Sequence, residues 1–214
     1  MQKNPIMMLL PSGMQIKMNV DAVILAGGAS RRMGVTCKAA LLLGNETLLD
    51  HVVKRVLPQV HHLCVSGSSD VLPETEFAIL EDVGVKYQGP LAGLYSALMR
   101  PQLSSADYLL ISPCDGPFIP KNLVEELYSQ IKASDFDVAV VRYEGFVQPT
   151  FSLWHKRTID QVRDSLLLDR SGGFKPLLSE LSTKYVDWPE EVLNPFFNIN
   201  TPADLAFAKD TLCL

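Results

Sequence analysis

The stretch that decides the fold is Val20-Asp-Ala-Val-Ile-Leu-Ala-Gly-Gly-Ala-Ser-Arg-Arg-Met-Gly34, with Lys38 just beyond it. Residues 20–26 form an apolar, partly β-branched run that ends in two glycines, which is typical of a buried parallel strand leading into a loop. Because Gly27 and Gly28 carry no side chain, their backbone N–H groups can approach a phosphate closely.

The residues around this loop decide between two interpretations. A strand followed by two glycines is, by itself, most often an ordinary turn. Arg31, Arg32 and Lys38 add positive charge nearby, however, and this favours a phosphate-binding loop. The loop is not a Walker motif, because Ala39 follows Lys38 where that motif has serine or threonine.

Outward from this stretch, hydrophobic periodicity predicts alternating strands and helices. Further strands are predicted at 62–66, 77–80, 108–112, 137–142, 147–154 and 184–187. Helices are predicted at 48–57, 90–100, 119–133, 156–168, 174–181 and 203–212, the last with Thr201 as its N-cap and Pro202 at its first position. This alternation predicts an open α/β sheet with helices on both faces, and ligands bind such sheets where strands end and helices begin.

Length and composition set the class of protein. The chain has 214 residues, of which 47% are hydrophobic and 20% charged, which suits one globular domain over 20–214 after an extension over 1–19. The net charge of −5 gives no general attraction to nucleic acid or to an anionic membrane. The apolar run at 7–11 is too short to span a bilayer. We therefore expect a soluble protein without nucleic-acid or membrane partners.

The cysteines indicate the compartment. They are widely spread and have neither CxxC spacing nor the spacing of a Cys/His metal site. The four are Cys37, Cys64, Cys114 and Cys213. A disulfide framework is not expected in a chain of this size, so the sequence favours a reducing, cytoplasmic location.

A second candidate ligand-binding segment is Gly89-Pro-Leu-Ala-Gly93, at the start of a predicted helix. Small residues there bring free N–H groups against a ligand. The same residues also suit close packing of a helix on a sheet, and the two interpretations stay open.

The third segment is Ile111-Ser-Pro-Cys-Asp-Gly-Pro-Phe118. Asp115 follows a buried strand, which is a common position for a Mg²⁺ ligand, because Mg²⁺ takes hard oxygen ligands and completes its shell with substrate phosphates. Alternatively, Asp115 only caps a turn before Pro117.

The fourth segment is Phe196-Phe-Asn-Ile-Asn-Thr-Pro-Ala-Asp204. Asn198 and Asn200 are two residues apart, so in an extended segment both side chains point to one side. One of them can complete a metal or phosphate shell, although the pattern is also ordinary helix capping.

Together these motifs resemble the molybdenum cofactor guanylyltransferase family, within the sugar-phosphate and cofactor nucleotidyltransferases. The resemblance covers nearly the whole chain and rests on LAGGASRRMG with its lysine, GPLAG after an aspartate, PCDGPF, and NINTPADL. The double glycine favours the guanylyl branch, since related cytidylyl enzymes more often have LAAG. The resemblance implies a three-layer, Rossmann-like, mostly parallel sheet of the nucleotide-diphospho-sugar-transferase type.

The resemblance also implies roles for individual residues. It places Asp82 and Ser68 near the nucleoside and Gly27 and Gly28 near the phosphates. The full nucleotide-binding set is Leu25, Ala26, Gly27, Gly28, Lys38, Ser68, Asp82, Gly93 and Asp115. The catalytic set is Lys38, Arg32 and Asp115, and Mg²⁺ is held by Asp115 with Asn200 or Asn198. Residues 148–154 resemble the acceptor side of the family's site, or are simply an edge strand.

Two positions depart from the family pattern. Cys37 stands where the family usually has an aspartate before the lysine, and Ser68 stands near the place of an asparagine that contacts the nucleoside. These two changes concern the selectivity of the site for the base of the bound nucleotide.

The function implied is Mg²⁺-dependent transfer of GMP from GTP to molybdopterin or the molybdenum cofactor, with release of pyrophosphate. Other cofactor-biosynthesis proteins or molybdoenzyme chaperones are the expected partners. Two alternatives stay open. One is a cytidylyl or sugar-phosphate nucleotidyltransferase on the same fold, and the other is a non-catalytic homologue that binds nucleotide or pterin.

Overall fold

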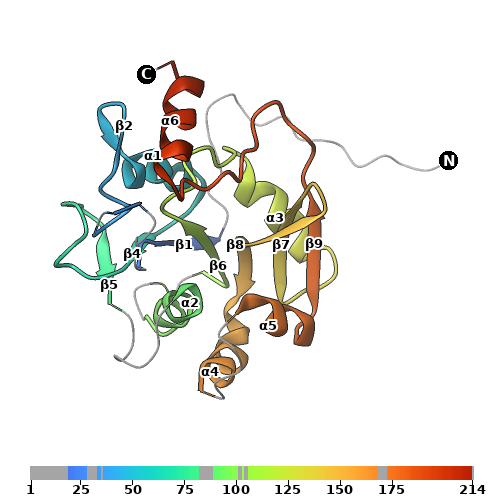
Figure 1. Cartoon of the computed structure of the whole chain (residues 1–214). Helices are drawn as coiled ribbons and strands as arrows, with labels where there is room; N and C mark the ends of the chain where they lie inside the picture. The colour runs from blue at the N-terminus through green and yellow to red at the C-terminus, as the bar shows by residue number, and fades with distance from the viewer. Residues whose placement is uncertain are drawn as a thin grey trace, which may run out of the picture.

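A seven-stranded sheet runs through the middle of the molecule, with the strand order β5-β4-β1-β6-β8-β7-β9 (Figure 1). The computed structural model describes residues 19–27, 33–34, 36–81, 89–100, 103, 106–167 and 173–213. Its strands are β1 Val20–Leu25, β4 Leu63–Ser66, β5 Ala78–Leu80, β6 Tyr108–Pro113, β7 Val138–Tyr143, β8 Phe146–His155 and β9 Thr183–Asp187. Each end of these strands lies within one residue of its predicted position.

The direction of the strands is almost uniform. β4, β1 and β6 pair in parallel, β5 pairs in parallel with β4, and β9 pairs in parallel with β7. β8 alone among these strands is antiparallel to its neighbours, because a tight turn through Glu144 and Gly145 returns the chain directly from β7. The β7–β8 register shifts between Val140 and Val141, so β8 bulges at 149–151. The carboxyl ends of the other strands therefore share one edge.

Helices cover both faces of the sheet and confirm the predicted three-layer architecture. α1 (Leu48–Val56) and α3 (Leu123–Lys132) pack on one face, and α2 (Pro90–Leu98), α4 (Ile159–Leu167) and α5 (Phe174–Glu180) pack on the other (Figure 1). Each face buries an apolar core against the sheet, because a sheet faced by helices must be apolar on both sides.

Three features differ from the predicted pattern. α3 begins at Leu123 and not at 119, and the carbonyl groups of Ile119 and Pro120 accept hydrogen bonds from the side chains of Arg55 and Gln59. A single 3₁₀ turn, Lys156–Thr158, precedes α4. A small hairpin of β2 (Leu42–Leu43) and β3 (Glu46–Thr47), too short to give a periodic pattern, was not predicted.

α6 (Pro202–Thr211) lies beside the β2–β3 hairpin and closes a third, smaller apolar cluster, with Leu43, Phe118 and Ile199 at its centre. Thr201 caps this helix as predicted, and its hydroxyl accepts a hydrogen bond from the Asp204 N–H. The segment 196–201, which precedes α6, is thereby fixed over the carboxyl edge of the sheet.

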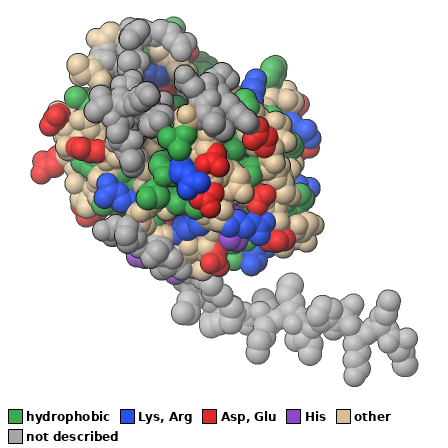
Figure 2. All heavy atoms as spheres, turned by 90° about the horizontal axis from the view of Figure 1, so that it is seen from below, with side chains coloured by type: hydrophobic (Ala, Val, Ile, Leu, Met, Phe, Trp, Pro, Cys, Tyr) green, Lys and Arg blue, Asp and Glu red, His purple; other side chains and the backbone are tan. Residues whose placement is uncertain are grey.

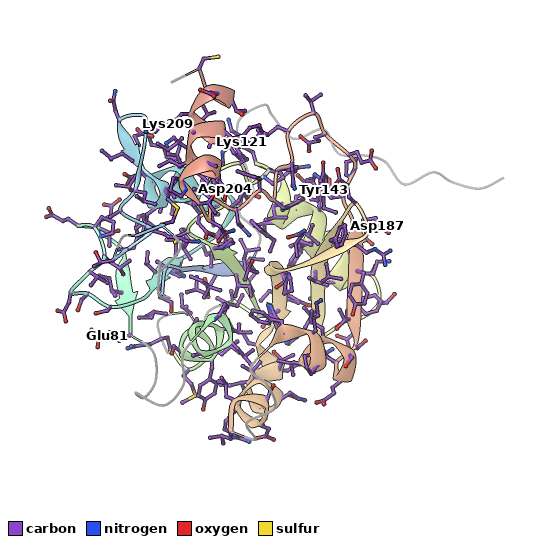
Figure 3. The ribbon with its side chains drawn as sticks, in the orientation of Figure 1. Glu81, Lys121, Tyr143, Asp187, Asp204 and Lys209 are labelled. Carbon is purple, nitrogen blue, oxygen red and sulfur yellow. The ribbon has the colours of Figure 1, made fainter. Side chains whose placement is uncertain are left out.

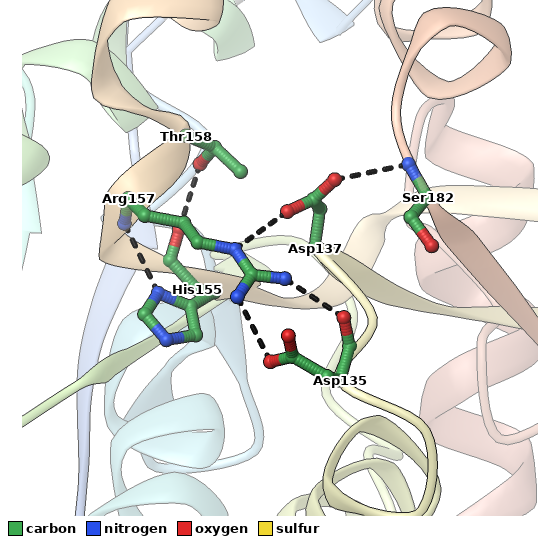
Figure 4. A network of polar contacts seen from close by, with 6 residues as sticks. All are labelled: Asp135, Asp137, His155, Arg157, Thr158 and Ser182. Atoms are coloured by element: carbon green, nitrogen blue, oxygen red, sulfur yellow. Dashed lines mark hydrogen bonds and ion pairs between the residues drawn. The ribbon is translucent and has the colours of Figure 1, made fainter.

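The opposite edge of the sheet is closed by an ion-pair network (Figure 4). Arg157 donates to the carboxylates of Asp137 and Asp135, at 2.7 and 2.8 Å, and Asp137 also accepts from the Ser182 N–H. The network joins the end of β8 to the loops before β7 and β9. Because Arg157 is half exposed, each pair contributes little to stability, about 0–1 kcal/mol.

The surface carries both signs of charge. On the face in Figure 2, Lys and Arg side chains are interspersed with Asp and Glu, in keeping with a net charge of −5. None of the helices in the described ranges is both long and apolar enough to cross a membrane.

Candidate active site at the carboxyl edge of the sheet

Three strand ends meet at this edge and are joined by backbone hydrogen bonds. The Ala26 N–H donates to Ser66 at 2.8 Å, and the Cys114 N–H donates to Leu25 at 3.0 Å. These bonds fix the residues that follow β1, β4 and β6 relative to one another. The predicted glycine loop and the Asp115 turn therefore start from adjacent, rigid points, as an open parallel sheet requires.

The loop after β4 lies against the glycine loop. A Cβ on Gly67 would meet the carbonyl carbon of Ala26 at 3.4 Å and the backbone nitrogen of Gly27 at 3.5 Å. Ser68 follows, is exposed, and accepts a hydrogen bond from the Asp70 N–H at 3.3 Å. The β4 loop thus approaches the glycine loop through its backbone, and Ser68 stands at the solvent side of that contact.

Lys38 lies at the centre of the site. Its Nζ donates to Asp115 Oδ2 at 2.8 Å and to Asn200 Oδ1 at 2.6 Å. The Lys38 and Asp115 side chains are only 20% and 15% exposed. Charge-assisted hydrogen bonds of this length are among the stronger ones in proteins. The structure therefore brings together three residues that the sequence placed in three separate motifs.

Asn200 and Asp115 are also held by backbone contacts. The Ile199 N–H donates to the carbonyl of Asp115 at 2.8 Å, and the N–H groups of Asn200 and Thr201 both donate to Asp204 Oδ2 at 2.8 Å. Figure 3 shows Asp204 at the first turn of α6. Burial raises the pKa of Asp204, but the hydrogen bonds from Asn200 and Thr201 outweigh it, so the pKa is lowered.

Asn198 behaves differently from Asn200. Its Oδ1 is buried and has no hydrogen-bond partner among the described residues. The same atom lies 3.1 Å from the position of a Cβ on Gly116. A buried amide oxygen without a partner is costly in a folded protein. This oxygen is therefore available to a ligand at the Asp115 turn.

A cavity of about 260 Å³ opens at this edge. Its lining residues are Leu25, Ala26, Gly27, Lys38, Pro90, Pro113, Cys114, Asp115, Thr150 and Asn198. Leu25, Ala26, Gly27, Lys38, Asp115 and Asn198 were predicted as site residues. Thr150, at the β8 bulge, belongs to the segment predicted as acceptor side or edge strand; the edge-strand alternative is wrong, because β8 lies between β6 and β7. Pro90, Pro113 and Cys114 had not been singled out individually, although each lies in a motif that had been.

The remaining predicted site residues either lie outside the described residues or are not in this lining. Gly28, Arg31, Arg32 and Asp82 lie outside the described residues. Gly93 is buried in α2, and a Cβ there would come within 2.7 Å of Leu25 Cδ2 and of Ser66 Oγ. Its N–H donates to the carbonyl of Gly89. Gly93 thus has a packing role, and its contact with a nucleotide stays a prediction, as does that of Ser68.

Two cysteines flank the central contact. Cys37 and Cys114 precede Lys38 and Asp115 in the chain, and both thiols lie in the same apolar cluster. Burial, together with the negative charge of Asp115, raises the pKa of Cys114 well above its usual range. Cys37 is 7% exposed and does not line the cavity. The departure from the family pattern at position 37 therefore lies in the core beneath Lys38.

The chain is similar in sequence to known proteins over most of its length. The model of the MobA-like NTP transferase domain matches residues 22–184. The chain belongs to the MobA-like NTP transferase family. The molybdenum cofactor guanylyltransferase of Rhodopseudomonas palustris is 33% identical over 88% of this chain and 90% of its own length. That of Sinorhizobium fredii is 34% identical, over 89% and 91%. The family prediction is thereby confirmed.

A solved structure confirms the predicted fold. The crystal structure of the molybdopterin-guanine dinucleotide biosynthesis protein A from Archaeoglobus fulgidus matches with a TM-score of 0.75, over 90% of this chain and 98% of that one. Only 22% of the aligned residues are identical. The architecture is therefore shared where most side chains have changed.

The donor atoms of this MobA-like transferase fit a magnesium ion. Asp115 offers a carboxylate, and Asn198 offers a buried amide oxygen without a partner. Mg²⁺ prefers oxygen ligands and is commonly held by one or two carboxylates, with water and substrate phosphates completing the shell. In the described part of the chain, no group of three or more His, Cys, Asp and Glu side chains is placed to hold a metal. A sparse, phosphate-completed site is the kind that these residues suit.

Proposed function

We propose that this nucleotidyltransferase transfers GMP from GTP to molybdopterin, or to its molybdenum-loaded form, and releases pyrophosphate. The observation that carries the proposal is the contact of Lys38 with Asp115 and Asn200, in which Lys38 and Asp115 line the cavity. The choice of GTP as nucleotide and of molybdopterin as acceptor is inferred from the names of the relatives, which are molybdenum cofactor guanylyltransferases. In our proposal the pterin phosphate enters near Thr150, on the side of β8.

The reaction requires that the two substrates be aligned, and it does not require an amino-acid nucleophile. The acceptor phosphate already carries the attacking oxygen. A bond forms between that oxygen and the α-phosphorus of GTP, and the bond from the α-phosphorus to the leaving pyrophosphate breaks. Positioning and neutralisation of charge supply most of the catalysis in such transfers.

Each site residue then has a role in the proposal. Lys38 offsets the charge on the pyrophosphate, and the N–H groups at Gly27 and Gly28 bind its oxygens. Asp115, with Asn198 or Asn200, holds Mg²⁺, which supplies further positive charge to the phosphates when it is bound. Arg32 assists Lys38, and Asp82 and Ser68 contact the nucleoside. The roles of Gly28, Arg32 and Asp82 rest on the sequence alone.

The first test removes the central carboxylate. Asp115→Ala should lower the rate of guanylyl transfer by a factor of about 100 or more, by analogy with the loss of one electrostatic contact in other enzymes. Asp160→Ala, at an exposed carboxylate on α4, is the matched control and should leave the rate unchanged. Near-normal transfer by Asp115→Ala at ordinary Mg²⁺ would refute this mechanism.

The second test addresses the base and separates the alternatives. Pyrophosphate release with molybdopterin should be fastest with GTP, compared with CTP, ATP and UTP. A preference for CTP would identify a cytidylyltransferase on the same fold. Thermal stabilisation by GTP without any turnover would identify a nucleotide-binding homologue, since a ligand that binds the folded state raises its melting temperature.

The same proposal includes a cytoplasmic location and partners among cofactor-biosynthesis proteins or molybdoenzyme chaperones. The location is supported by the cysteines of the described ranges, which are all free thiols and three of which are buried. Free thiols suit a reducing compartment.

A further inference from the structure

Lys38 occupies the point where two oxygen donors converge. Asp115 Oδ2 and Asn200 Oδ1 approach its ammonium group from two other segments of the chain, at 2.8 and 2.6 Å. Both oxygens belong to the set that the proposed function assigns to Mg²⁺. The Lys38 ammonium thus contacts the same oxygens that are proposed as ligands of the metal ion.

An ammonium and a divalent cation cannot both occupy the point between these two oxygens. Placed within about 4 Å of each other, two positive charges repel strongly in a partly buried site, where the effective dielectric constant is lower than in water. Lys38 must therefore leave Asp115 and Asn200 when a metal ion binds there. Its long, flexible side chain allows this movement without a change in the backbone.

The backbones of Asp115 and Asn200 are held by contacts that do not involve Lys38. The Asp115 carbonyl is bonded to the Ile199 N–H, and the Asn200 N–H is bonded to Asp204. These backbone bonds hold both residues in place from the side of α6. Removing the lysine should consequently leave the two segments that carry these ligands in place, with both oxygens free of a competing cation.

We propose that in the nucleotide-free protein the Lys38 ammonium occupies the position of the metal ion. When the metal binds, it displaces this ammonium, which then contacts the triphosphate. The proposal rests on the proposed function, because it takes Asp115 and Asn200 as metal ligands. It makes metal and nucleotide binding cooperative. A metal ion that binds alone must break the two hydrogen bonds of Lys38 without replacing them. When nucleotide binds as well, its phosphate oxygens offer the displaced ammonium new hydrogen bonds. Such coupling is reciprocal by thermodynamic linkage.

The experiment measures Mn²⁺ binding to the full chain without nucleotide, from the paramagnetic resonance signal of the free ion. Lys38→Met should bind Mn²⁺ about tenfold or more tightly than the wild-type protein, since the competing cation is gone. Lys38→Gln should show the same gain, because it removes the charge while keeping a polar hydrogen-bond donor in a somewhat shorter side chain. Adding Asp115→Asn to either variant should abolish the gain and so locate the ion.

The matched control is Lys54→Met. Lys54 is ion-paired with Glu46 on an exposed surface, so this variant makes the same change in net charge and also releases a carboxylate from its lysine. It should bind Mn²⁺ as the wild-type protein does. Circular dichroism at the assay temperature verifies that each variant is folded.

The second arm repeats the titration with GTP. GTP should increase Mn²⁺ affinity strongly in the wild-type protein and much less in Lys38→Met. The inference is overturned if folded Lys38→Met and Lys38→Gln bind Mn²⁺ no more tightly than the wild type, or if Asp115→Asn leaves their gain intact. A different base preference in the transfer assay would instead overturn the proposed function, and the Mn²⁺ result would stand.

Discussion

The ring of Phe151 fills the space that a side chain on Gly116 would need. Phe151 is fully buried in β8, and its Cζ lies 2.8 Å from the position of a Cβ on Gly116. Because Gly116 directly follows Asp115, this contact sets how closely the Asp115 turn packs on the bulge of β8. The packing behind the Asp115 turn is therefore determined by a glycine and an aromatic ring that fit each other.

The first prediction concerns this pair. Gly116→Ala should lower the free energy of unfolding by about 1–3 kcal/mol, because a methyl group must displace a buried ring. Phe151→Leu should remove much of that penalty, with a coupling energy of about 1 kcal/mol in a double-mutant cycle. Urea unfolding of the four proteins measures both values. Additive effects would show that the ring is not what excludes a side chain at position 116.

The second prediction concerns Cys37. Cys37→Asp, which restores the residue usual in the family, should lower the free energy of unfolding by about 1–3 kcal/mol, because the thiol lies in an apolar core and a carboxyl group there would need a partner. Cys37→Ala, which introduces no polar group, is the control and should cost less. If Cys37→Asp unfolds at the wild-type urea concentration or higher, position 37 has a polar partner that the described residues do not reveal.

The third prediction concerns acid stability. The pKa of Asp204 is lower in the folded protein than its usual value, so its ionised form stabilises the fold at neutral pH. This contribution is present above the unfolded-state pKa of about 4 and is lost as the pH falls through the lower, folded-state pKa. Asp204→Asn should therefore cost about 1 kcal/mol at pH 7, as the loss of a helix cap does.

The difference between Asp204→Asn and the wild type should shrink as the pH is lowered toward 3, and denaturant titrations over this range measure it. Asp210→Asn, at the other end of α6, is the control and should show no such trend. A constant difference at every pH would mean that the charge of Asp204 is not what stabilises the cap.

The fourth prediction concerns the buried carboxylate at the start of β1. Asp21 is completely buried and accepts hydrogen bonds from Lys156 at 2.9 Å and from His62 at 3.1 Å. Lys156→Met should lower the free energy of unfolding by about 2–4 kcal/mol, because it leaves a buried charge with one exposed partner. Adding Asp21→Asn should restore part of that loss. Calorimetric melting temperatures of the single and double variants supply the comparison.

Much of the fold was predictable from local patterns. Apolar runs such as those at 20–25 and 108–113 are fully buried, so their composition alone indicates parallel strands faced by helices on both sides. The Thr201-Pro202 start of α6 is a local signal as well, because an N-cap is satisfied within one helical turn. The ends of parallel strands share one edge, so the strand pattern also predicts that the motifs after β1 and β6 lie close together.

Other features needed the tertiary structure. Gly93 looked equally suited to a ligand or to close packing, and the contacts with Leu25 and Ser66 show the packing role. The short β2–β3 hairpin and the direction of β8 follow from tight turns between adjacent strands, and the hydrophobic periodicity of single segments does not reveal such turns.

The sequence by itself determined the order of strands and helices, which follows from local composition and spacing, and the family, which follows from the resemblance of its motifs. Only the tertiary structure decided that Lys38 binds Asp115 and Asn200, which are 77 and 162 positions away along the chain. The physical reason is that a hydrogen bond depends on ångström-scale distances between atoms. Those distances are set by the packing of distant segments and not by the residues next to each partner.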